Sequence, residues 1–117
     1  MSKDIKKIYL NRTVYEESLN RVRWLFDEFE NVMVGFSGGK DSTVCFNLAL
    51  KVAEEKNRLP LTVVFLDQEA EYQNVIDYVE QIMTDERVNP FWIQAPFKIN
   101  NATSFENPWL YCWKEGE

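Results

Sequence analysis

The stretch of sequence that decides the fold is VMVGFSGGKDS, residues 32–42. Its first five residues are apolar or small and include β-branched valines, which predicts a short buried strand over 32–36. A polar loop with adjacent glycines follows. Residues 42–57 are then apolar over most of a helix circumference, which predicts a helix whose first turns are deeply packed. A strand, a glycine-bearing loop and a helix in this order are typical of a parallel α/β unit.

The alternation of helix and strand extends in both directions from this stretch. Thr13 and Glu16 form a capping-box pattern at the start of the first predicted helix. The predicted elements are helices over 14–30, 42–57 and 72–83, and strands over 32–36, 61–66 and 90–94. We therefore predict an α/β fold in one domain, residues 1–117, with parallel strands in the order 3-2-1.

The last part of the chain, residues 95–117, is rich in aromatic residues but has no regular period. We expect it to form an ordered, packed loop segment, an aromatic-rich tail. Cys112 lies between two aromatic residues there, which favours a small packed residue over a redox-active thiol. Cys45 falls on the packed part of the second helix, so we predict that it belongs to the core.

Composition excludes several classes of function. The chain has 117 residues with 13 Lys and Arg, 19 Asp and Glu, two cysteines and no histidine. There is thus neither a disulfide framework nor catalysis by a histidine. The net charge of -6 disfavours nucleic acid as a partner, and no apolar run is long enough to span a membrane. We expect a soluble, cytoplasmic protein.

The loop after the first strand has the chemistry of a phosphate cradle. Gly38 and Gly39 let the backbone approach an anion, Ser37 and Ser42 add hydroxyl donors, and Lys40 adds a positive charge. The start of the following helix supplies unpaired N–H groups at the carboxyl end of a strand, where ligands of open parallel sheets bind. The spacing matches neither the Walker A loop nor the dinucleotide-binding fingerprint.

The hexapeptide SGGKDS, residues 37–42, resembles the signature loop of the PP-loop ATP pyrophosphatase superfamily, which includes the phosphoadenosine phosphosulfate reductases. The resemblance continues through residues 11–16, 26–29, 65–70, 101–104 and 109–113. Together these segments resemble the amino-terminal part of the reductase-related IbrA-type proteins. The resemblance implies an adenine nucleotide α-hydrolase-like three-layer sandwich. It further implies that the chain binds ATP or phosphoadenosine phosphosulfate, through Phe36, Ser37, Gly38, Gly39, Lys40, Asp41, Ser42 and Asp67.

The resemblance also implies a reaction, cleavage of ATP between the α and β phosphates to adenylate a substrate, with Lys40 and Asp41 as the catalytic residues. Asp41 also lies at or near the cap of the second helix, where Asp is common for capping alone, but the resemblance favours a role in the site. The chain lacks the Glu-Cys-Gly-x-His motif of the reductases, so we do not expect it to reduce phosphoadenosine phosphosulfate alone. It also stops where related proteins generally continue, so we expect a minimal or truncated member of the family. The alternative is a non-catalytic regulatory or interaction module that keeps the nucleotide cradle and works with a ParB-like partner, as the resemblance suggests.

Further candidate residues follow the second and third strands. Asp67 and Glu69 are candidate ligands of Mg²⁺ bound with the nucleotide phosphates, although Glu69 is explained as well by the start of the third helix. Lys98, Asn100 and Asn101 follow the third strand and are candidate substrate contacts, with asparagine in a turn as the alternative. The strand over 32–36 would be an open edge, which suggests a homo-oligomer or cover by the first helix and the tail.

Overall fold

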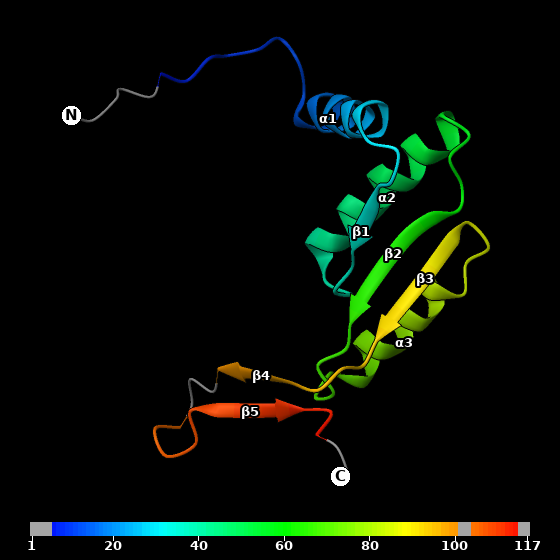
Figure 1. The fold of residues 1–117 in the computed structure, drawn as a ribbon. Coiled ribbons are helices and arrows are strands. Elements are labelled where there is room, and N and C mark those ends of the chain that lie inside the picture. Colours follow the sequence, from blue (N-terminus) through cyan, green and yellow to red (C-terminus); the bar gives the residue numbers. More distant parts are fainter. Residues whose placement is uncertain (1–5, 101–103, 115–117) are drawn as a thin grey trace.

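The computed structural model describes residues 6–100 and 104–114 (Figure 1). Its elements are α1 (Val14–Glu28), β1 (Met33–Gly35), α2 (Lys40–Glu55), β2 (Leu61–Leu66), α3 (Gln73–Met83), β3 (Val88–Ile93), β4 (Phe97–Asn100) and β5 (Trp109–Cys112). The first six elements form the predicted α/β unit. The last two form a separate hairpin beyond the carboxyl ends of the parallel strands.

The three-stranded sheet has the predicted topology. Its strands run in the order β1-β2-β3 and both pairs are parallel, with Val34 opposite Val63 and Phe65 opposite Trp92. Each strand is joined to the next through one helix, α2 or α3, as right-handed crossovers require. The α/β class and the strand order expected from the sequence are confirmed.

The sheet buries one face and exposes the other. Leu61, Val63 and Phe65 of β2 are fully buried and pack with apolar residues of α2 and α3. The side chains between them face the other way, and four apolar residues of the three strands on that face remain 40–67% exposed: Met33, Leu66, Phe91 and Ile93. Within the described residues, helices therefore cover one face of the sheet, and the opposite face is apolar and open.

Helix α1 packs against α2 and is closed at both ends. At its start, the Thr13 hydroxyl accepts from the Glu16 N–H at 3.1 Å, and the Glu16 carboxylate accepts from the Thr13 N–H at 2.9 Å. At its end, the Arg58 guanidinium donates to the carbonyls of Phe26, Phe29 and Glu30. The predicted capping box is thus present, and Arg58 binds one carbonyl in the last turn of α1 and two just beyond it.

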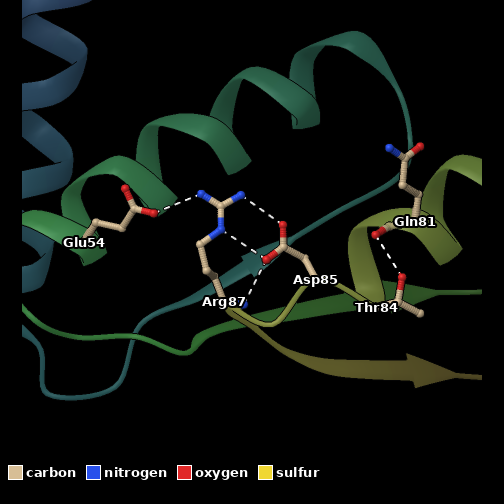
Figure 2. A network of polar contacts seen from close by, with 5 residues as sticks. All are labelled: Glu54, Gln81, Thr84, Asp85 and Arg87. Carbon is tan, nitrogen blue, oxygen red and sulfur yellow. Dashed lines mark hydrogen bonds and ion pairs between the residues drawn. The ribbon is translucent and has the colours of Figure 1, made fainter.

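Arg87 joins the end of α2 to the turn before β3 (Figure 2). Its guanidinium donates to Asp85 and to Glu54, each at 2.9 Å. The hydrogen bonds from Arg87 lower the pKa of Asp85 to about 2, so this carboxylate stays ionised through the ordinary range of pH. The network lies at the amino ends of the strands, away from the glycine-bearing loop.

Helix α2 differs from the prediction at its start. It begins at Lys40, with Gly39 as N-cap, so Asp41 lies in the first turn rather than at the cap. The prediction that Cys45 is a core residue was wrong, because Cys45 and the neighbouring Val44 are exposed. Among the described residues, the polar contacts of α1 with α2 are made by Lys51 and Glu55, in the second half of α2, away from Cys45.

The aromatic-rich tail contains regular structure that the sequence pattern did not predict. Strands β4 and β5 pair antiparallel, with Phe97 opposite Cys112 and Asn100 opposite Trp109. Cys112 is buried as expected, whereas Phe105, Trp109 and Tyr111 remain exposed. None of the helices in the described ranges is long and apolar enough to cross a membrane.

Candidate functional site

The Ser37 loop, residues 37–42, connects β1 to α2 at the carboxyl end of the sheet. Gly39 caps α2 with extended backbone angles and no side-chain hydrogen bond. In the part of the chain that the structure describes, the N–H groups of Lys40, Asp41 and Ser42 have no acceptor. Unpaired donors at the positive end of a helix dipole have the chemistry that suits an anion.

The two adjacent glycines serve different purposes. Gly38 has a φ of +81°, and a Cβ there would lie 2.7 Å from Cγ1 of Val75. Gly39 has a φ of -84°, and its Cβ would meet only Ser37 Oγ, at an ordinary 3.5 Å. Gly38 is therefore required by the fold, whereas the missing side chain at Gly39 leaves the helix N-terminus open to a ligand.

Hydroxyl groups hold the loop in shape. Ser42 Oγ accepts from the Ser37 N–H at 3.2 Å and lies 3.0 Å from Ser37 Oγ. Ser42 and Thr43 donate to the Gly39 carbonyl, and Tyr78 donates to Thr43 at 3.3 Å. The loop is thus fixed from within, and its exposed N–H groups are held in place before any ligand arrives.

The predicted catalytic side chains, Lys40 and Asp41, are exposed on the first turn of α2. No hydrogen bond or ion pair engages either of them within the described ranges. Phe36, also predicted as a nucleotide contact, is different. Its ring is buried against Phe46 and Tyr78, and its N–H donates to the Val64 carbonyl. Phe36 anchors the start of the loop.

A hollow of about 430 Å³ lies beside the Ser37 loop, on the open face of the sheet. Its lining includes Gly35 and Ser37 from β1 and the loop, Val64 and Leu66 from β2, and Gln68 and Glu71 after β2. A Cβ at Gly35 would have nothing within 4 Å, so the floor at this strand is flat and empty. We call this space the Gly35 hollow. It offers an apolar surface next to the Ser37 loop.

Asp67 follows β2 but points toward the buried face. It is 3% exposed, and its Oδ2 accepts from Trp92 Nε1 at 2.9 Å and from Gln94 Nε2 at 3.1 Å. Its Oδ1 accepts from the Glu69 N–H at 2.8 Å. Burial opposes ionisation of Asp67, but these hydrogen bonds outweigh it and hold its pKa below the ordinary value.

Trp113, just after β5, contacts the same segment. Its N–H donates to Glu69 Oε2 at 2.5 Å, and its indole Nε1 donates to the Asp67 carbonyl at 2.7 Å. The neighbouring Cys112 is buried, and burial together with the nearby carboxylates of Glu69, Asp67 and Glu71 raises the pKa of its thiol. A protonated, buried thiol agrees with a packed residue.

The two carboxylates predicted as Mg²⁺ ligands, Asp67 and Glu69, both accept hydrogen bonds from the protein. No group of three or more acidic or cysteine residues in the described part of the chain could hold an ion. Mg²⁺ in nucleotide sites is held by one or two carboxylates together with phosphate oxygens and waters, so the expectation that Asp67 and Glu69 bind it stays a prediction.

The residues predicted after the third strand lie on the hairpin. Lys98 and Asn100 are exposed on β4, and Lys98 Nζ lies 5.2 Å from the centre of the Tyr111 ring. Asn101 lies outside the described residues. No contact of Lys98 or Asn100 with the Ser37 loop is found among the described residues. The hairpin meets the site through Trp113 instead.

Sequence reasoning missed three residues that shape the site: Trp92, Gln94 and Trp113. Trp92 and Gln94 alternate at the end of β3, which places both side chains on the face that Asp67 also uses. Once β3 is assigned, this alternate spacing predicts that the two side chains lie on the same face. Nothing local marks Trp113, which meets Asp67 from 46 positions away.

Comparison with known proteins identifies relatives. The family model for the phosphoadenosine phosphosulfate reductase domain matches residues 31–109. The uncharacterised protein YbdN of Escherichia coli (strain K12) is 31% identical over 113 residues, 94% of this chain and 28% of that protein. Sulfate adenylyltransferase subunit 2 of Mycobacterium tuberculosis (strain ATCC 25618 / H37Rv) is 40% identical over 65 residues, 56% of this chain and 21% of that protein.

A further sulfate adenylyltransferase subunit 2, from Mycolicibacterium vanbaalenii, is 32% identical over 77 residues, 66% of this chain and 25% of that protein. The chain thus spans about a quarter of the length of these curated relatives. No solved structure is significantly similar to it.

Proposed function

Because the chain belongs to the phosphoadenosine phosphosulfate reductase domain family, we propose that it binds an adenine nucleotide, ATP or phosphoadenosine phosphosulfate, with the phosphates at the Ser37 loop. The start of α2 carries this proposal. Three N–H groups without acceptors and the exposed Lys40 converge there, on a loop that its own hydroxyl groups hold in shape. Such a site recognises a phosphate or sulfate by charge-assisted hydrogen bonds.

The Gly35 hollow supports an adenine base on the same ligand. It adjoins Ser37, so a nucleotide with its phosphates at the loop can lay its base on the open face of the sheet. Gly35 leaves the floor flat, while Val64 and Leu66 supply apolar surface for a planar ring. The polar edge of the base faces Gln68 and Glu71, whose side chains offer hydrogen-bond partners.

Adenylyl transfer is a second candidate function, favoured by the relatives named sulfate adenylyltransferase subunit 2. In this reaction a nucleophile attacks the α phosphate of ATP and pyrophosphate leaves. The N–H groups at the start of α2 and Lys40 would stabilise the charge that develops on the phosphates. Release of pyrophosphate by the chain with ATP supports this reaction. Binding without release favours a non-catalytic nucleotide-binding module.

The first experiment is calorimetric titration of ATP, phosphoadenosine phosphosulfate and adenosine into the wild type and Lys40→Ala at fixed salt. We expect Lys40→Ala to weaken ATP binding by roughly 1.5 to 3 kcal/mol, which is more than about tenfold in affinity. Adenosine binding should change little, because adenosine has no phosphate. Thermal unfolding should also change little, since the Lys40 side chain is exposed and makes no hydrogen bond or ion pair with other described residues.

Lys51→Ala is the matched control, because it removes the same charge from the same helix on the side that contacts Tyr15. It should leave the affinity for ATP unchanged. If ATP binds to neither the wild type nor Lys40→Ala, or binds equally to both, the Ser37 loop does not hold phosphate and the proposal fails.

A further inference from the structure

The segment between β2 and α3 contributes to the Gly35 hollow without regular secondary structure. Gln68 and Glu71 line the hollow, but residues 67–72 form neither helix nor strand. Glu69 has a φ of +67°, in the left-handed region that non-glycine residues rarely occupy. A segment with such a conformation keeps a defined shape only when contacts from elsewhere hold it there.

Trp113 provides two of these contacts, and they lie on either side of Gln68. The indole N–H donates to the carbonyl of Asp67, and the main-chain N–H donates to the carboxylate of Glu69. Trp113 itself has a φ of +52°. Two residues in left-handed conformations, from segments far apart in sequence, therefore meet each other and hold each other's geometry.

The buried side chain of Asp67 completes the support. Trp92 and Gln94 donate hydrogen bonds to its carboxylate, and the carboxylate also accepts a hydrogen bond from the Glu69 N–H. The main chain around Gln68 is thereby held by Asp67 on the core side and by Trp113 on the hairpin side. The direction in which Gln68 enters the hollow is set by both.

We propose that Trp113 is a positioning residue for the nucleotide site: by binding Asp67 and Glu69, it holds the segment 67–71 in the shape that receives the base. The inference rests on the proposed function. It assigns a role to the aromatic-rich hairpin, which carries Trp113 to the sheet without touching the phosphate loop itself. It also gives Glu69 a part as a hydrogen-bond acceptor instead of a metal ligand.

The test compares adenosine and ATP binding by calorimetry in Trp113→Phe, which keeps an aromatic ring but lacks the indole N–H. We expect both affinities to fall by the same factor, about three- to tenfold, because the base and not the phosphates loses its support. Trp109→Phe, at the other end of β5 and exposed, is the matched control and should bind as the wild type does.

Glu69 provides a second pair of variants. Glu69→Gln keeps an oxygen acceptor for the Trp113 N–H and should retain affinity, whereas Glu69→Ala removes the acceptor and should resemble Trp113→Phe. If the charge of Glu69 mattered instead, through a metal, Glu69→Gln would lose as much affinity as Glu69→Ala, and the inference would be overturned.

Hydrogen exchange of the amides of residues 68–70 reports the segment directly. Trp113→Phe should exchange these amides faster than Trp109→Phe does, at a temperature where circular dichroism shows both variants folded. If the wild type binds nucleotide and Trp113→Phe binds it with the same affinity, this inference is overturned but the proposed function is not. Absence of binding by the wild type overturns the proposed function, and this inference with it.

Discussion

The two longest helices begin in opposite ways. Helix α1, of 15 residues, is closed at its start by its own side chains, because Thr13 and Glu16 satisfy each other's N–H groups. Helix α2, of 16 residues, begins after a glycine that offers no side chain, and its first N–H groups have no acceptor among the described residues. Both starts obey the same electrostatics, but only α1 satisfies its donors internally.

We interpret the difference as one between a structural helix start and a proposed binding one. A capping box stabilises a helix by about 1 kcal/mol, and α2 forgoes that stabilisation at the one helix start that adjoins both Lys40 and the Gly35 hollow. The donors left open there are available to an anion. Variants that close the open start, or open the closed one, therefore test whether this contrast has a functional meaning.

The largest effect should come from closing the start of α2 with Gly39→Asp. The extended backbone of Gly39 suits an N-cap, and a Cβ there meets only Ser37 Oγ at 3.5 Å. The new carboxylate should accept from the first N–H groups and repel phosphate, which weakens ATP binding about 100-fold, or about 2.8 kcal/mol. The free energy of unfolding should rise by about 0.5 kcal/mol.

Calorimetry of this variant checks the loss of ATP affinity, and thermal unfolding checks the gain in stability. Gly39→Asn, a neutral cap of nearly the same shape, should lose less affinity, because it blocks the donors without adding charge. A Gly39→Asp variant that binds ATP as the wild type does would remove the distinction between the two helix starts.

The next effect concerns the paired substitutions Gly38→Ala and Gly39→Ala. We expect Gly38→Ala to lower the free energy of unfolding by about 2 kcal/mol, because its positive φ and the close Val75 side chain both oppose a Cβ. Gly39→Ala should change it by less than about 0.5 kcal/mol. Denaturant unfolding of the two variants measures the difference. Equal losses would mean that the two glycines do not divide their roles as described.

The smallest effect should come from opening the start of α1 with Thr13→Ala. Loss of the hydroxyl acceptor should lower the free energy of unfolding by about 1 kcal/mol, measured by denaturant unfolding, and leave ATP affinity unchanged. Thr13→Ser keeps the hydroxyl and should stay close to the wild type. A drop in ATP affinity in Thr13→Ala would show that the two helix starts are coupled.

The sequence predicted what depends on local pattern. The Ser37 loop, the capping box and the parallel order of the strands follow from spacing within short windows, and they appear where expected. The hairpin β4–β5 was missed although Phe97 and Ile99 are half-buried and alternate with the exposed Lys98 and Asn100. Four residues are too short a run for this alternation to stand out beside the prolines and asparagines of the tail.

Features that depend on distant partners could not be predicted. The position of Asp67 at the end of β2 was foreseen, but its direction is set by Trp92 and Gln94, 25 and 27 residues away. Cys45 was assigned to the core because α2 is apolar on several sides. Which side is covered depends on where α1 crosses, and no local period records that.

The open face of the sheet has a consequence for the heat capacity of unfolding. Leu66, Phe91 and Ile93 are already in contact with water in the folded protein, so they add little to the increase in heat capacity when the chain unfolds. The increase per residue should therefore lie below the usual value of about 12–15 cal/mol/K, and stability should vary less steeply with temperature. A base bound on this face would bury part of its exposed apolar surface, so nucleotide binding should have a negative heat-capacity change.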